Sequence, residues 1–187
     1  MAGGILDRLR ALLGSAEAAK PAAHRTIFVE EDSWGEVEVL PVANADWCRA
    51  EFDRISAFAD AHRVPGGAGW TDIYIRPPAP VPLADLHLPL AAVLDVLGAR
   101  LTRFDSVTSG SFYAPEPVAN ARGFSASPKT ALIVISDTDE TIVKSIPVVA
   151  DEDDGAARLM AALESLPSSG RLIVVDWVRG ELLAVRP

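Results

Sequence analysis

The segment "ALIVISDTDETIVKSIPVVA", residues 131–150, holds two runs of apolar residues on either side of a short acidic turn. Isoleucine and valine, which favour strands, dominate both runs. The intervening DTDE contains the aspartates that turns prefer. Two such runs with a short turn between them predict an antiparallel hairpin. The segment therefore indicates a fold with a mainly antiparallel sheet.

Acidic residues gather at both ends of the second run: Asp137, Asp139 and Glu140 before it, and residues 151–154 after it. They suggest either a metal or acid/base site, or the turn and helix start that such a stretch needs. A straight strand between the two groups would hold them about 30 Å apart. Neither group has the ligand pattern of a calcium loop, whereas carboxylates suit turns and helix N-termini. We therefore predict structural roles and no metal site.

Amphipathic helices are predicted on both sides of this hairpin. Each has apolar residues at helical spacing, and these are Cys48, Phe52, Ile55 and Ala59; Leu90, Leu94, Leu97 and Leu101; and Leu159, Met160, Leu163 and Leu166. Further strands are predicted within residues 26–31, 36–42, 70–78, 102–113, 171–177 and 182–185, the first two as a hairpin. In the 70–78 strand, Ile73 and Ile75 form the predicted buried face. These elements make an α+β fold with helices packed on the sheet.

An internal repeat is one interpretation of this order of elements. Residues 26–43 align with 132–149 without a gap, and each stretch precedes an amphipathic helix and an apolar strand. The repeat units would be 26–78 and 130–185, two strand-strand-helix-strand halves of a single domain over 26–187. Alternating strands also resemble one another by chance. Duplication and chance resemblance both remain open.

A short amphipathic helix and an Ala-rich linker are predicted over residues 1–25. The apolar face consists of Ile5, Leu6, Leu9, Leu12 and Leu13. With so few basic residues, docking on its own domain or on a second subunit, as in a homodimer, is favoured over membrane anchoring.

The net charge of the chain limits the classes of molecule that it is predicted to bind. Seventeen basic and 26 acidic residues give a net charge of −9, which opposes binding to phosphates and so argues against nucleic acid. A single cysteine, no secretory leader and no apolar run of about 18 residues predict a cytoplasmic protein without a membrane span. Fourteen arginines against three lysines, with abundant alanine, are typical of a high-GC bacterium.

The sequence contains no recognisable catalytic motif. His24, His62 and His87 lack the spacing that would place two imidazoles on one helical face, so no zinc site is indicated. Cys48 lies in an apolar stripe and is predicted to be core rather than a nucleophile. "PGGAGW", residues 65–70, lacks the spacing of a dinucleotide-binding loop. We predict no cofactor and no catalytic residue.

The predicted binding residues are aromatic and loop residues. Trp34 in a turn and Trp70 after a glycine loop are candidate interface anchors, unless each folds back over the sheet edge. Residues 114–129 are predicted to form a long irregular loop, a type that is often functional. In or beside this loop lie four further candidates: Tyr113, Asn120, Arg122 and Lys129.

Two functions follow as hypotheses. The first is a non-catalytic protein-binding module of a bacterial cytoplasm, such as an acidic inhibitor or immunity-type protein. The alternative is a small-molecule hydrolase that uses loop 114–129 with carboxylates supplied from the strands.

Overall fold

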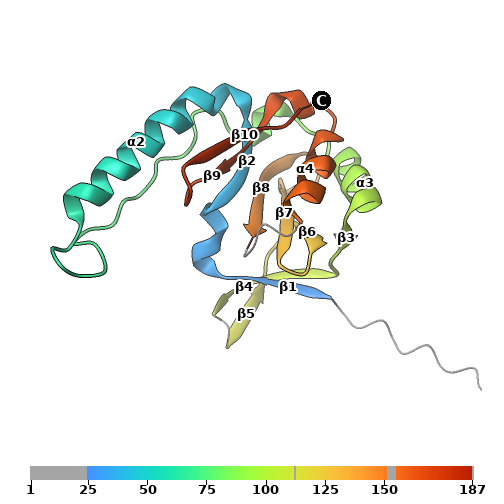
Figure 1. Cartoon of the computed structure of the whole chain (residues 1–187). Coiled ribbons are helices and arrows are strands. Elements are labelled where there is room, and N and C mark those ends of the chain that lie inside the picture. Colours follow the sequence, from blue (N-terminus) through green and yellow to red (C-terminus); the bar gives the residue numbers. More distant parts are fainter. Residues whose placement is uncertain (1–24, 112, 151–154, 187) are drawn as a thin grey trace, which may run out of the picture.

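The computed structural model describes residues 25–111, 113–150 and 155–186 and has the predicted α+β fold (Figure 1). Its centre is a seven-stranded sheet in which all six pairs of neighbouring strands are antiparallel. In sheet order, the strands are β10 (Glu181–Ala184), β9 (Leu172–Asp176), β2 (Val37–Pro41), β8 (Val143–Ala150), β7 (Thr130–Ser136), β6 (Ala121–Ser127) and β3 (Thr102–Arg103).

The predicted hairpin of residues 131–150 is confirmed as β7 and β8. In its turn, the Asp137 carboxylate accepts hydrogen bonds from the Thr141 amide at 2.7 Å, the Thr141 hydroxyl at 2.8 Å and the Ile142 amide at 3.2 Å. These bonds lower the pKa of Asp137, and the bond from the Thr141 amide has the largest effect. Asp137 therefore has the predicted structural role, while residues 151–154 lie outside the described residues.

Two helices cover one face of the large sheet, α3 (Leu90–Arg100) and α4 (Ala156–Glu164). Their predicted apolar stripes are confirmed, because most of the stripe residues are buried and Leu94 and Met160 pack against the same core. The helices meet inward-facing strand residues of this core, among them Phe124, Leu132, Ile146 and Val174. Alternation along each strand leaves the intervening residues for the other face.

The other face is covered by a second sheet and by the start of α2 (Ala45–His62). The second sheet consists of β1 (Thr26–Val29), β4 (Ser106–Ser111) and β5 (Ala114–Pro117), with β1 parallel to β4. Val29 and Val107 pack on Ile133 of β7. Cys48 of α2 packs on Leu40 and Ile173 of β2 and β9. The large sheet is therefore buried on both sides.

The predicted hairpin of residues 26–42 is wrong. β1 and β2 belong to different sheets, because the 3-10 helix Glu31–Gly35 redirects the chain and β1 pairs with β4, whose residues lie 80 positions further along the chain. Since residues 132–149 do form a hairpin, the two proposed repeat units differ in strand pairing. The structure does not show a duplication. Three further 3-10 helices are Val42–Asn44, Leu83–Leu86 and Ser169–Arg171.

The predicted irregular loop of residues 114–129 is also wrong, because it contains β5 and β6. Its sequence is rich in Pro, Gly, Ala and Ser, which hides the strand signal. Contacts with residues distant in the chain explain the glycine at position 123. A Cβ there would lie 3.1 Å from Ile27 Cγ2 and 3.2 Å from Phe104. Close packing of the second sheet on β6 therefore favours a small residue at this position.

The predicted amphipathic helix of residues 1–25 lies outside the described residues, apart from Arg25. Within the part of the chain that the structure describes, no helix combines the length and the apolar character needed to cross a membrane.

Candidate functional site

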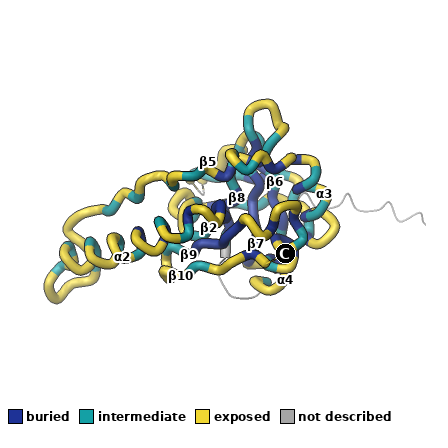
Figure 2. The backbone as a smooth tube through the Cα atoms, turned by 90° about the horizontal axis from the view of Figure 1, so that it is seen from above, coloured by how far each residue is buried: buried dark blue, intermediate teal, exposed yellow. Residues whose placement is uncertain are grey.

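A long arm projects from the body of the molecule (Figure 1). The first half of α2 is anchored on the sheet by Cys48 and Phe52, but the second half runs beyond the sheet. The chain turns at residues 63–70 and comes back along the helix in an extended conformation. We call residues 53–76 the arm. Figure 2 shows that its residues are mostly exposed or only partly buried.

The tip of the arm is closed by backbone hydrogen bonds. The Thr71 amide donates to the His62 carbonyl at 2.8 Å, and the Val64 amide donates to the Gly69 carbonyl at 3.1 Å. Gly69 has φ +135°, a conformation that residues with a Cβ rarely adopt. The glycines of "PGGAGW" therefore serve to turn the chain.

A buried carboxylate holds the returning segment to the helix. Glu51 is fully buried and accepts a hydrogen bond from the Tyr74 hydroxyl at 2.6 Å and another from Arg54. The Tyr74 ring also lies 5.2 Å from the Phe58 ring, centre to centre. The bond to Glu51 raises the pKa of Tyr74. We call this arrangement the Glu51 latch.

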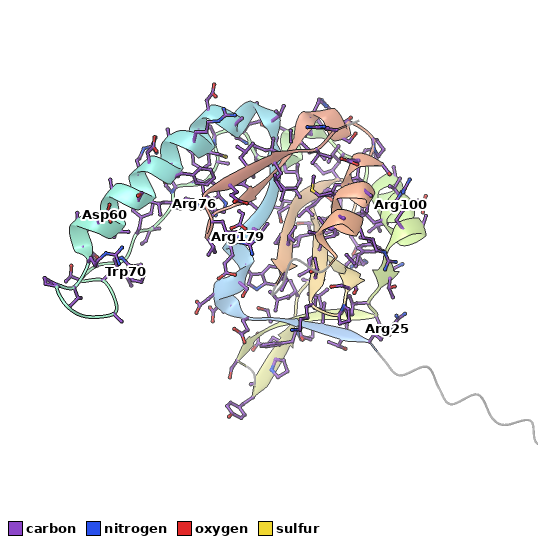
Figure 3. The ribbon with its side chains drawn as sticks, in the orientation of Figure 1. Arg25, Asp60, Trp70, Arg76, Arg100 and Arg179 are labelled. Carbon is purple, nitrogen blue, oxygen red and sulfur yellow. The ribbon has the colours of Figure 1, made fainter. Side chains whose placement is uncertain are left out.

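Arg76 attaches the base of the returning segment to the sheet (Figure 3). Its guanidinium lies 2.8 Å from the Glu38 carboxylate and 4.0 Å from the centre of the Trp177 ring. The Trp177 indole also donates to Glu38, at 2.8 Å. Tyr74 and Arg76 thus both point inward, and each has specific partners.

Alternation along the extended segment then turns Ile73 and Ile75 outward. Their exposed fractions are 82% and 86%, and that of Trp70 is 59%. The prediction that the isoleucines form a buried strand face is wrong, because the tyrosine and arginine occupy the inner side and the segment belongs to no sheet. We call Trp70, Ile73 and Ile75 the ridge.

A hollow of about 300 Å³ adjoins the ridge, between the helix and the returning segment. Trp70 and Ile73 belong to both the ridge and the hollow, and the rest of the lining is Ile55, Phe58, Ala59, Asp72 and Tyr74. The second half of the predicted helical stripe, Ile55 and Ala59, therefore faces this hollow instead of the sheet. The arm presents a large apolar surface that nothing in the described chain covers.

The two candidate tryptophans lie in different environments. Trp34 packs against the core of the second sheet, and its indole donates to the Ser109 hydroxyl at 2.7 Å. Trp70 stands at the end of the arm (Figure 3). The structure does not bring these two residues together, and only Trp70 belongs to the ridge.

The four candidates of the 113–129 region are also dispersed. Tyr113, 94% exposed, lies at the turn between β4 and β5. Asn120 donates to the Asp137 carbonyl at 3.2 Å, and Arg122 pairs with Glu140 at 2.9 Å. Lys129 lies in the turn after the C-terminal end of β6, whereas Asn120 and Arg122 lie at its start. Asn120 and Arg122 therefore support the β7–β8 turn.

The described residues contain no group of three or more His, Cys, Asp or Glu side chains placed to hold a metal ion. Cys48, the only cysteine, is buried as predicted. Burial, and then the Glu38 charge, raise its pKa to about 11. Because the raised pKa leaves little thiolate near neutral pH, Cys48 is poorly suited to be a nucleophile.

We expect Cys48 to react with iodoacetamide at pH 8 about 100-fold more slowly in the folded protein than an ordinary thiol, from the thiolate fraction alone. Mass spectrometry after timed quenching measures this rate. A Val178→Cys variant supplies the exposed thiol for comparison, since Val178 is 71% exposed. Equal labelling of the two thiols in folded protein would contradict the burial of Cys48.

The predictions from sequence missed the ridge isoleucines, Tyr74 and Glu51. One signal was present: Glu51 follows Cys48 by three residues and precedes Ile55 by four, so it lies on the apolar face of the predicted helix. A carboxylate in that position needs buried partners. Nothing in the local pattern identified Tyr74 as the partner.

The chemistry of the arm is apolar contact on the outside and hydrogen bonding on the inside. Its three arginines are each paired within the chain, with Glu51, Asp60 and Glu38. Such a surface suits binding of another protein surface. Comparison of the chain with protein-family models, with curated proteins and with solved structures found no match.

Proposed function

We propose that this chain is a non-catalytic protein-binding module of a bacterial cytoplasm and that its arm is the binding element. The observation that carries the proposal is the ridge: Trp70, Ile73 and Ile75 lie within six residues of one segment and are 59%, 82% and 86% exposed. Large exposed apolar patches on soluble domains mark interaction sites. Tryptophan is also enriched among the residues that dominate binding energy.

The arm is built to present this surface. The Glu51 latch and the Arg76 contacts with Glu38 and Trp177 fix the returning segment from inside, so the ridge is ordered before a partner arrives. Preorganisation of this kind lowers the entropic cost of association. The support comes from this apolar surface and not from the net charge of the chain.

The test is affinity capture with the tagged full-length chain as bait. The proteins are captured from a lysate of bacterial cells that also express the untagged chain. We expect a stoichiometric protein partner, which the double variant Ile73→Ser/Ile75→Ser fails to retain. Serine removes the apolar surface at two positions that are 82% and 86% exposed, so little packing within the chain is lost.

The matched control is Val178→Ser/Leu183→Ser, which removes two exposed apolar side chains, 71% and 52% exposed, from the β9–β10 region instead. This variant should retain the partner. If the ridge variant captures the same proteins as the unmodified chain, or if neither captures any protein, the proposed function is wrong.

A further inference from the structure

The arm has the parts of a self-complementary interface. Ile75 protrudes at one end of the ridge, and the apolar hollow lies at the other end, where Ile73 and Trp70 form part of its lining. Ile73 and Ile75 are two residues apart on an extended segment, and so about 7 Å apart. A two-fold interface requires the projection and the recess to lie on the same surface of one chain, so that each copy fills the other.

We propose that the partner of the ridge is a second copy of this chain, bound arm to arm about a two-fold axis. Ile75 of each copy enters the hollow of the other, against Ile55, Phe58 and Ala59. The inference rests on the proposed function, since it names the partner at the same surface.

The charge distribution favours a second copy. The arm contains three acidic residues, Asp53, Asp60 and Asp72, and three basic residues, Arg54, Arg63 and Arg76. It therefore has no net charge, and the entire charge of −9 belongs to the rest of the chain. Two copies that met through their bodies would bring like charges together.

The shape of the molecule lowers the repulsion between the negatively charged bodies of two copies. The arm projects away from the sheets (Figure 1), and two copies can therefore meet through their arms without packing one body on the other. Charges separated by more than about 8–10 Å are largely screened at physiological ionic strength. Arm-to-arm association is thus the contact that an acidic chain of this shape can make with itself at low electrostatic cost.

The pairing of charges within the arm also favours a second copy. Because all three arm arginines are already paired within the chain, the partner has no need to supply charges. An uncharged apolar surface like the arm itself meets this requirement.

The experiment is sedimentation velocity on the purified full-length chain over a dilution series. We expect a species of twice the 19.8 kDa chain mass that dissociates on dilution. Ile73→Ser/Ile75→Ser and the single variant Ile75→Arg should be monomers throughout. Val178→Ser/Leu183→Ser should associate like the unmodified chain. Far-UV circular dichroism checks that each variant is folded.

Disulfide trapping tests the geometry. When an Ile75→Cys chain and an Ala59→Cys chain with different tags are mixed and mildly oxidised, we expect the mixed dimer to exceed either like-with-like dimer. Cys48 should not interfere, since it is buried. Excess of the like-with-like dimers would overturn the proposed arrangement.

The sedimentation outcomes separate the two proposals. A monomer at every concentration overturns self-association, and so does a dimer that the ridge variants leave unchanged. If the purified chain is a monomer but the ridge variant loses a different protein in the capture experiment, the proposed function stands without the second copy. If the ridge variants change neither experiment, both proposals fail.

Discussion

Replacing Phe124 by alanine is expected to lower the free energy of unfolding by about 3–5 kcal/mol. Phe124 is fully buried in β6, within the core that α3 and α4 form on the large sheet. Its strand pairs with β7 on one side and with β3 on the other, so the backbone cannot easily collapse into the space left by the ring. The cost therefore includes lost apolar burial and a residual cavity.

Urea denaturation followed by far-UV circular dichroism measures this change. The matched control is Tyr113→Ala, which removes a ring of similar size that is 94% exposed. We expect a change within about 0.5 kcal/mol for the control. A loss below about 1 kcal/mol for Phe124→Ala would show that the core is not packed as described.

Replacing Tyr74 by phenylalanine is expected to cost about 1–3 kcal/mol, because the fully buried Glu51 carboxylate then loses the hydroxyl that donates to it. The ring and its contact with Phe58 remain. Because the lost hydrogen bond belongs to the Glu51 latch, the lower stability should appear first as local opening of the arm. Hydrogen exchange measured by mass spectrometry should show faster exchange in the second half of α2, with little change in β7 and β8.

A double-variant cycle distinguishes the hydrogen bond from packing. Removing both polar partners of a buried bond can be nearly neutral, whereas removing one leaves the other unsatisfied. We therefore expect Tyr74→Phe/Glu51→Leu to lose less stability than the sum of its single variants. Strict additivity in urea denaturation would mean that Glu51 and Tyr74 do not interact across the arm.

Sequence reasoning succeeded where local pattern and burial agree. The β7–β8 hairpin, helices α3 and α4 and the turn role of Asp137 were all predicted, because each depends on residues close in the chain. Cys48 was also placed correctly, since its stripe packs directly on the sheet. For these elements, apolar periodicity and turn chemistry contain most of the information.

Sequence reasoning failed where partners are distant in the chain. β1 pairs with β4 instead of β2, and β6 forms from a segment rich in turn residues because β7 and β3 supply its hydrogen bonds. Neither pairing leaves a local signal. Strand propensity reflects context as much as the residues themselves.

For the candidate site, Trp70 was selected from sequence. The sides of the neighbouring segment were assigned the wrong way round, because Ile73 and Ile75 were predicted to be buried and are exposed. By itself, the sequence determined that residues 72–76 alternate, that the helix before them carries Glu51 on its apolar side, and that the arm has no net charge. Only the tertiary structure decided which side of the alternation faces inward. Glu51 and Glu38, 23 and 38 residues away in the chain, bind Tyr74 and Arg76. Because the buried Glu51 and the partly buried Glu38 both require donors, these bonds turn the two polar side chains inward and leave Ile73 and Ile75 exposed.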